Sequence, residues 1–214
     1  MPSLGTSIPH DSAPGHVTGT APYVEDLTPL VGELWIDFVG SPVAAGKVLS
    51  VDAAEAMKLP GVVGVYTHED LPAGGVNRFG PIFHDELFLV EDEIAYAGQP
   101  VAVVAAETRE LARQARHLVK IKVEEAEPVL TIEQAVAAES YLGPIRHIQR
   151  GDLDAAFAAA PHTLEGTFIN NGQEQFYLES QACQALPGEQ GQLKLICSTQ
   201  IPTETQAVVA VILG

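Results

Sequence analysis

The stretch Gln99–Val123 reads QPVAVVAAETRELARQARHLVKIKV, and the order of its segments decides the expected fold. Val101–Ala106 is a short apolar run typical of a buried strand, and the Gly98-Gln99-Pro100 triplet at its start predicts a turn. Thr108 is a favoured N-cap, and the helix predicted from there to Leu118 carries its apolar residues on one face. Val119–Val123 alternates as a strand. Strand, helix and strand over this length predict a crossover unit with the helix on one face of a mixed sheet.

Strands are also predicted on the N-terminal side of this unit. Aromatic and β-branched residues mark Glu33–Gly40, Lys47–Val51 and Val62–Tyr66 as strands. Between the last two, Asp52 is expected to cap a short helix that ends at Pro60. Residues 1–31 are rich in Pro, Gly, Ser and Thr and are predicted to be extended and irregular, and residues 74–81 are predicted to be a surface loop. The chain is therefore expected to be an α+β protein.

The C-terminal half shows clearer helix signals than strand signals. Short helices are predicted over residues 131–138 and, capped by Asp152, up to Pro161. Strands are predicted over residues 163–169 and 192–197. Pro202 suits the first turn of a final helix. Because Ala207–Leu213 is apolar all round, that helix is expected to be buried on several sides.

Composition excludes several classes of protein. The chain has 214 residues, 46% of them hydrophobic and 18% charged, which indicates a globular protein with a real core. Its net charge of −17 argues against binding to nucleic acid or to anionic membranes. No apolar run approaches a membrane span of ~20 residues, and no secretory signal is apparent. Cys183 and Cys197 have neither CxxC nor zinc spacing, so a cytoplasmic protein with reduced, buried thiols is expected.

Two stretches rich in carboxamides are the best candidates for a site. Gly172–Gln181 reads GQEQFYLESQ, and Cys197–Gln200 reads CSTQ. Carboxamides are neutral and offer both donor and acceptor atoms, which suits a polar ligand; the alternative is a strand end with solvated polar flanks. The His84-Asp85-Glu86 triplet is interpreted as a solvated loop in preference to a metal site. Phosphate-loop and nucleophile motifs are absent from the sequence, so the residues alone define no complete catalytic site.

These stretches resemble one family in particular. Its members are the xanthine dehydrogenases and aldehyde oxidases, and the resemblance is to the N-terminal part of the molybdopterin-binding subunit of bacterial xanthine dehydrogenases. The similar segments follow the family's order and cover nearly the whole chain: HDSAPGHVTGTAPYVEDL (His10–Leu27), LPGVVGVYTHEDLP (Leu59–Pro72), YAGQPVAVVAAETRELARQA (Tyr96–Ala115), RGDLDAAFAAAPHTLEGTF (Arg150–Phe168), NGQEQFYLESQ (Asn171–Gln181) and LICSTQ (Leu195–Gln200).

The resemblance implies a domain organisation. Residues 1–12 would be an extended lead-in, residues 13–125 an α/β hammerhead domain and residues 126–149 a connector. Residues 150–214 would be the opening, and incomplete, segment of a molybdopterin-binding domain. The family's glycine-rich element, its substrate-contacting Glu and Arg, and its base glutamate all lie further along the subunit. The chain alone is therefore expected to hold no catalytic residue and to be inactive.

The resemblance also implies an activity. The family uses water to hydroxylate purines such as xanthine and hypoxanthine, related heterocycles or aldehydes at a molybdenum–molybdopterin cofactor. Electrons leave through 2Fe-2S clusters and FAD on a partner subunit. The family's STQ glutamine hydrogen-bonds an oxo ligand of molybdenum, and Gln200 matches it, so Gln200 is predicted to bind the cofactor; no metal ligand is expected. Many relatives carry His where this chain has Gln175, which is given no ligand role.

The expected partners follow from the same family. They are the remainder of the molybdopterin subunit, the iron–sulfur and FAD subunit, and a purine substrate, with neither nucleic acid nor membrane. A second hypothesis of a different class stays open, in which the chain is a free-standing, non-catalytic hammerhead module for binding or assembly.

Overall fold

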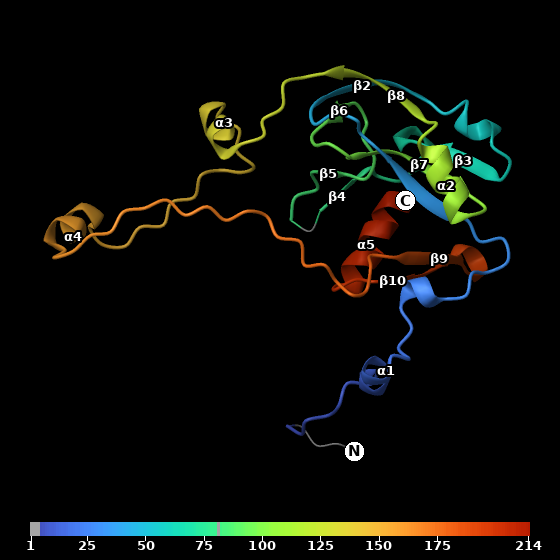
Figure 1. The fold of residues 1–214 in the computed structure, drawn as a ribbon, viewed down its shortest axis with the longest axis horizontal. Coiled ribbons are helices and arrows are strands. Elements are labelled where there is room, and N and C mark those ends of the chain that lie inside the picture. Colours follow the sequence, from blue (N-terminus) through green and yellow to red (C-terminus); the bar gives the residue numbers. More distant parts are fainter. Residues whose placement is uncertain (1–4, 81) are drawn as a thin grey trace. The chain divides into compact units, whose positions relative to one another are not determined.

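A computed structural model describes residues 5–80 and 82–214 (Figure 1). The chain forms two compact units. The first combines the described residues up to Pro128 with Glu179–Gly214, and the second is Val129–Leu178. The predicted α+β class is confirmed, because both units contain helices and the first contains antiparallel sheets as well.

Strand β7 (Pro100–Ala106) is the centre of a three-stranded sheet in the first unit (Figure 1). Strands β1 (Trp35–Gly40) and β3 (Val62–Tyr66) pair with β7 on its two sides, and both pairings are antiparallel. Strand β7 is apolar throughout because it is covered: Val104 has no exposed surface and lies in the main hydrophobic cluster. The strands predicted for this part of the sequence are confirmed.

Helix α2 (Arg109–Arg116) packs on this sheet. The Thr108 hydroxyl caps it by accepting a hydrogen bond from the Leu111 N–H at 3.1 Å. Its buried residues are Ala112 and Ala115, whose small side chains allow a close approach to β1 and β7. The amphipathic helix predicted here is confirmed.

A second sheet contains β2 between β6 and β8, and all its pairings are antiparallel. Its strands are β2 (Gly46–Asp52), β6 (Glu93–Ile94) and β8 (Lys120–Glu125). The predicted crossover within one mixed sheet is therefore wrong, because α2 connects strands of two different sheets. Both edges of β7 are already paired with β1 and β3, so β8 pairs with β2 instead. A separate buried cluster that includes Val90, Ile94 and Val101 lies beneath this sheet.

Two predictions for the N-terminal part need correction. Helix α1 (Ala13–Thr18) and the 3-10 helix η1 (Val24–Asp26) form within the segment predicted to be irregular. Pro near the first turn and a left-handed Gly19 after the last turn explain the limits of α1. Asp52 does cap a turn, accepting from the Ala54 N–H at 2.9 Å, but only the 3-10 helix η2 (Ala56–Lys58) follows.

Between β3 and β6 the chain forms a long excursion with little regular structure. It contains the 3-10 helix η3 (His68–Asp70) and the short strands β4 (Arg78–Phe79) and β5 (Glu86–Leu87), which pair with each other. The predicted surface loop overlaps β4, so that part of the prediction is wrong.

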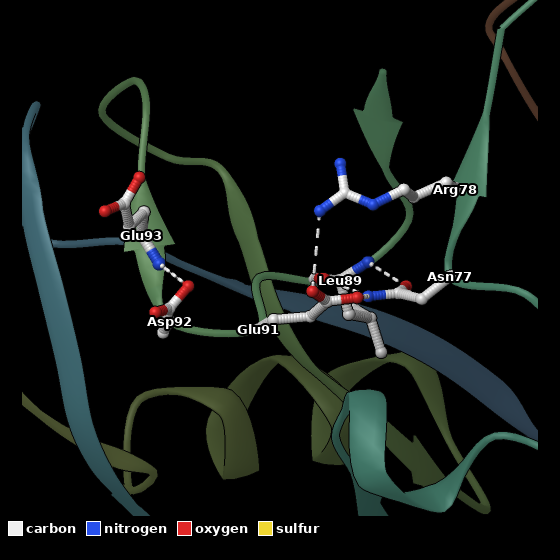
Figure 2. Close-up of polar contacts among 6 residues, drawn as sticks. All are labelled: Asn77, Arg78, Leu89, Glu91, Asp92 and Glu93. Atoms are coloured by element: carbon white, nitrogen blue, oxygen red, sulfur yellow. Dashed lines mark hydrogen bonds and ion pairs between the residues drawn. The ribbon is translucent and has the colours of Figure 1, made fainter. Parts of the chain in front are cut away.

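The side chain of Asn77 holds this excursion together through hydrogen bonds to Leu89 (Figure 2). Its side chain is buried; Nδ2 donates to the Leu89 carbonyl at 2.7 Å, and Oδ1 accepts from the Leu89 N–H at 3.0 Å. Nδ2 also lies 3.1 Å from Glu91 Oε1, and Glu91 pairs with Arg78 at 3.6 Å. The N–H and the carbonyl of Leu89 would pair with a neighbouring strand in a sheet. Here the carboxamide of Asn77 pairs with both groups instead.

The C-terminal part of the first unit is a hairpin followed by a helix. Strands β9 (Cys183–Pro187) and β10 (Leu193–Cys197) pair across the 3-10 helix η4 (Glu189–Gly191), and α5 (Pro202–Leu213) follows. The strand predicted near β10 and the helix beginning at Pro202 are confirmed. Within α5, all of which the structure describes, Ile212 alone is buried, so the described residues of this chain do not supply the expected burial on several sides, which stays a prediction.

The second unit contains helices α3 (Ile132–Ala137) and α4 (Leu153–Ala159), as predicted. Thr131 and Asp152 cap them, accepting hydrogen bonds from the Gln134 N–H at 3.2 Å and the Ala155 N–H at 3.0 Å. The strand predicted over residues 163–169 is wrong, since no strand forms within Val129–Leu178, all of which the structure describes. A strand requires a pairing partner, whereas a capped helix satisfies its own backbone.

Candidate functional site

The hairpin β9–β10 positions the segment Ser198–Gln200. Ser198 continues the ladder beyond β10, and its N–H donates to the Ala182 carbonyl at 3.1 Å. Its hydroxyl accepts from the Ala182 N–H at 3.1 Å and donates to the Ser180 carbonyl at 3.1 Å. Ser198 is therefore held by its own hairpin, which fixes where the next two residues leave the sheet.

Thr199 joins this segment to the first turn of α5. Its hydroxyl oxygen accepts a hydrogen bond from the Ile201 N–H at 3.2 Å and another from the Thr205 hydroxyl at 3.1 Å. Like Ser198, Thr199 thus uses its side chain locally. Both hydroxyls therefore have partners within the chain.

Gln200 differs from both neighbours. It is exposed, and its carboxamide has no hydrogen-bond partner among the described residues, 5–80 and 82–214. The predicted site residue therefore lies at a fixed point of the backbone with a neutral donor and acceptor available. That arrangement suits a ligand which takes a hydrogen bond without an added charge.

The far end of α5 is held by the excursion that Asn77 fastens. The Val76 N–H donates to the Val211 carbonyl at 2.9 Å, and Ile212 is buried there. Gly75 lies directly against the backbone of Ile212, where a Cβ would collide with the carbonyl oxygen. Helix α5 has 12 residues and follows directly after Ile201, so this contact anchors the helix that begins beside Gln200.

The other carboxamide stretch, Gly172–Gln181, contains no strand, so the alternative of a strand end is wrong for it. Its residues up to Leu178 belong to the second unit and are exposed, Gln175 among them. Phe176 has a positive φ of 52°, which is uncommon for a residue with a bulky side chain. Gln200 belongs to the first unit, as do the last three residues of this stretch, so the stretch is divided between the two units.

Other candidates give no further site. The His84-Asp85-Glu86 triplet is exposed, and within the described residues no group of three or more His, Cys, Asp or Glu side chains is arranged to hold a metal ion. The acidic run Glu91–Glu93 is exposed, and within it Glu93 forms a largely solvated ion pair with Lys47 at 3.7 Å (Figure 2 shows Glu91, Asp92 and Glu93). In the same described residues, no helix has the length and apolar character needed to span a membrane.

The thiols are less buried than the sequence predicts. Cys183 is exposed and Cys197 is partly buried, and both are free. Partial burial raises the pKa of the Cys183 thiol, and the adjacent Cys197 adds to that effect. Sequence reasoning missed β9 and therefore the placement of Cys183. The turn residues Gly188 and Gly191 between two apolar runs were the available signal for the hairpin.

Family models match both parts of the chain. Residues 18–127 match the α/β hammerhead domain of aldehyde oxidase and xanthine dehydrogenase, and residues 134–214 match the molybdopterin cofactor-binding domain. The fold is thus a hammerhead domain followed by the start of a molybdopterin-binding domain.

Related proteins agree with these matches. The chain is 41% identical to xanthine dehydrogenase of Emericella nidulans over 99% of its length, and 40% identical to aldehyde oxidase 4 of Cavia porcellus. Solved structures of aldehyde oxidoreductase from Desulfovibrio gigas and quinoline 2-oxidoreductase from Pseudomonas putida 86 align with TM-scores of 0.83 and 0.81, each at 27% identity, over 96% and 98% of this chain. The chain belongs to the xanthine dehydrogenase and aldehyde oxidase family.

The matched relatives are much longer than this chain. It spans 16% of the Emericella nidulans protein and 15% of the Cavia porcellus protein. In the two solved structures it covers 25% and 28% of the matching chains.

Proposed function

We propose that this chain is the N-terminal portion of a molybdenum hydroxylase subunit and that Gln200 contacts the molybdenum–molybdopterin cofactor. The observation that carries the proposal is the free carboxamide of Gln200 at the end of a hairpin whose other polar side chains, Ser198 and Thr199, are already bonded. The match of residues 134–214 to the molybdopterin cofactor-binding domain supports the choice of ligand.

The residues present fit this group. A neutral donor can hydrogen-bond the cofactor without adding a charge that would change the potential of the metal. When bound, the cofactor supplies the oxidation of carbon with oxygen from water. The chain's own contribution is to hold Gln200: the hairpin fixes the residue on one side, and the anchored α5 fixes it on the other.

The finer assignments are part of the same proposal. The substrate is a purine such as xanthine or hypoxanthine, or a related heterocycle or aldehyde; the identities to xanthine dehydrogenase (41%) and to aldehyde oxidase 4 (40%) are nearly equal. Electrons pass to 2Fe-2S clusters and FAD on a partner subunit, in the cytoplasm. The hammerhead domain is residues 13–125, residues 126–149 connect it onward, and residues 150–214 begin the cofactor domain. By itself, the chain is inactive and binds no stoichiometric molybdenum, because Gln200 supplies one contact only.

Substitution of Gln200 within a full-length enzyme tests the proposal. Gln200→Ala is expected to lower kcat by on the order of 100-fold, the usual loss for one donor at a reacting centre, while molybdenum content stays unchanged. The control is Gln206→Ala on the exposed surface of α5, which is expected to alter neither quantity. An unchanged kcat in Gln200→Ala would contradict the cofactor contact, and loss of molybdenum would make Gln200 a structural residue.

A further inference from the structure

The two cysteines of the chain lie opposite each other in the hairpin β9–β10. The register pairs Cys183 directly with Cys197, at the end of the ladder next to Ser198. Both thiols are free. Thirteen residues separate them in the sequence, from Gln184 to Ile196, so the sequence spacing matches none of the common cysteine motifs.

The hydrogen bonds on either side of this pair determine its geometry. The Ser198 N–H donates to the Ala182 carbonyl at 3.1 Å, and the Gly188 N–H donates to the Gln192 carbonyl at 2.7 Å. In an antiparallel ladder, hydrogen-bonded and non-hydrogen-bonded pairs alternate. With residues 182 and 188 in hydrogen-bonded pairs, Cys183 and Cys197 form a non-hydrogen-bonded pair.

Such a pair has the right dimensions for a crosslink. Opposite residues of a non-hydrogen-bonded pair have Cα atoms about 4.5 Å apart and side chains on the same face. Disulfides span Cα distances of about 4.4–6.8 Å. The two sulfur atoms can therefore bond without a change of register.

Small reagents can reach the pair. Cys183 is exposed, and the next residue that shares its face of β9, Ala185, is exposed too. The opposite face carries Gln184, whose Nε2 donates to Glu33 Oε2 at 3.0 Å. The Gln184 side chain thus contacts the rest of the first unit from the face opposite the thiols; on the thiol face Cys183 and Ala185 are exposed, and Leu195 and Cys197 across the ladder are partly buried.

We propose that Cys183 and Cys197 are a reversible redox site, which a peroxide oxidises to a cross-strand disulfide. The Cys183 thiolate, a minor form because partial burial and the nearby Cys197 raise the pKa of this thiol, attacks one peroxide oxygen, the O–O bond breaks, and the first water leaves after protonation. The sulfur of Cys197 then displaces the hydroxyl group from the sulfenic acid, losing its proton, and the second water leaves. The two thiols lose two electrons and two protons, and the peroxide is reduced to two waters.

The disulfide stiffens the hairpin at the point where the candidate site begins. Cys197 precedes Ser198 directly, and Gln200 is the third residue after it. Formation of the disulfide follows from the hairpin alone, whereas its effect on Gln200 rests on the proposed function. A dithiol reductant returns both thiols by exchange.

Peptide mapping of the 214-residue chain tests the proposal. The chain is treated with hydrogen peroxide, free thiols are blocked with iodoacetamide, and trypsin is added with and without dithiothreitol. Lys194 is the one tryptic position between the cysteines, so cleavage gives peptides 151–194 and 195–214. Without reductant, these peptides are expected to remain joined, lighter by two hydrogen atoms than their sum, and reductant is expected to separate them. Two alkylated cysteines or sulfinic acids after peroxide treatment would overturn the proposal.

Two controls distinguish register from simple proximity. Cys183→Ser combined with Gln184→Cys moves the first thiol to the other face of β9, and this variant is expected to give no linked peptide. Linking at the rate of the unaltered chain would overturn the proposal. Mixing ¹⁵N-labelled with unlabelled chains before oxidation is expected to give no peptide pairs of mixed label, and abundant mixed pairs would show crosslinking between chains instead.

Discussion

The two three-stranded sheets of the first unit and the segment Val129–Leu178 contain comparable apolar side chains, but only the sheets bury them. In these sheets, Val101 and Val104 are almost entirely buried; Val104 lies in the cluster that includes Ala115 of α2, and Val101 lies in the second cluster with Val90 and Ile94. In the second unit, Leu142, Ile148 and Phe157 are exposed by 111%, 98% and 66%, although α4 around Phe157 is well formed and capped. Secondary structure is thus present in both regions, and an enclosed core is present in only one.

This difference separates what local signals decide from what tertiary contacts decide. Caps such as Thr131 and Asp152 are enough to define short helices in the second unit. Stability comes mainly from apolar surface removed from water, at about 25 cal/mol per Å². We therefore expect the first unit to unfold cooperatively and the second unit to contribute little to that transition. Matched substitutions in the two units test this expectation, with the fluorescence of Trp35 on β1 reporting on the first unit.

The largest difference is expected for a buried charge. Val104→Asp places a carboxylate at the centre of β7, where the side chain has no exposed surface. An unpaired buried charge is expected to lower the free energy of unfolding by about 3–5 kcal/mol. The matched change Phe157→Asp lies on exposed α4 and is expected to alter it by less than about 0.5 kcal/mol. Urea titrations of both variants measure the contrast, and similar losses would break the comparison.

A smaller effect is expected for the buried carboxamide. Asn77→Ala leaves the buried N–H and carbonyl of Leu89 without their partners. We expect a loss of about 2–4 kcal/mol, from two groups at about 1–2 kcal/mol each, in the lower part of the usual range of about 1–3 kcal/mol for a buried group left unpaired. The matched variant Asn171→Ala removes an exposed carboxamide in the second unit and is expected to be neutral. If Asn77→Ala were equally neutral in urea titration, Asn77 would not fasten the excursion around β4 and β5.

The smallest of these effects concerns a glycine. A Cβ at Gly75 would collide with the Ile212 carbonyl, whereas a Cβ at Gly172 would meet no atom within 4 Å. Gly75→Ala is expected to cost about 1–3 kcal/mol, the usual range for overpacking, and to speed hydrogen exchange at the C-terminal end of α5. Gly172→Ala is expected to leave both unchanged. Unaltered exchange in Gly75→Ala would show that α5 is not anchored through this contact.

The sequence predicts elements better than it predicts their partners. The apolar run of β7 and the N-cap Thr108 are local signals, so β7 and α2 are predicted nearly to the residue. Strand β8 pairs with β2 because β1 and β3 already pair with both edges of β7. No local sequence pattern predicts this choice of partner. Strand β9 is not predicted, although the turn residues Gly188 and Gly191 before the strand predicted at residues 192–197 are a sequence signal for a hairpin.

For the candidate site too, the sequence predicts the residue but not the contacts that position it. The chemistry of Gln200 is evident from its side chain, and the resemblance to the family selects it from the other glutamines. The hydroxyls of Ser198 and Thr199 form hydrogen bonds with Ser180, Ala182 and Thr205. These partners lie in other segments of the chain, so the bonds cannot be predicted from the residues next to Gln200. The anchoring of α5 at Gly75 joins residues more than a hundred positions apart, beyond the reach of sequence patterns.

Limited proteolysis with thermolysin tests the central contrast most directly, because this protease cuts beside accessible apolar residues. In Val129–Leu178 such residues include Leu142, Ile145 and Ile148, with exposures of 111%, 81% and 98%. Within the part of the chain from β1 to Leu178, we predict that the first cuts fall in residues 129–178. A fragment that extends from β1 to β8 is expected to persist. Early cleavage between β1 and β8, with residues 129–178 still intact, would contradict the account.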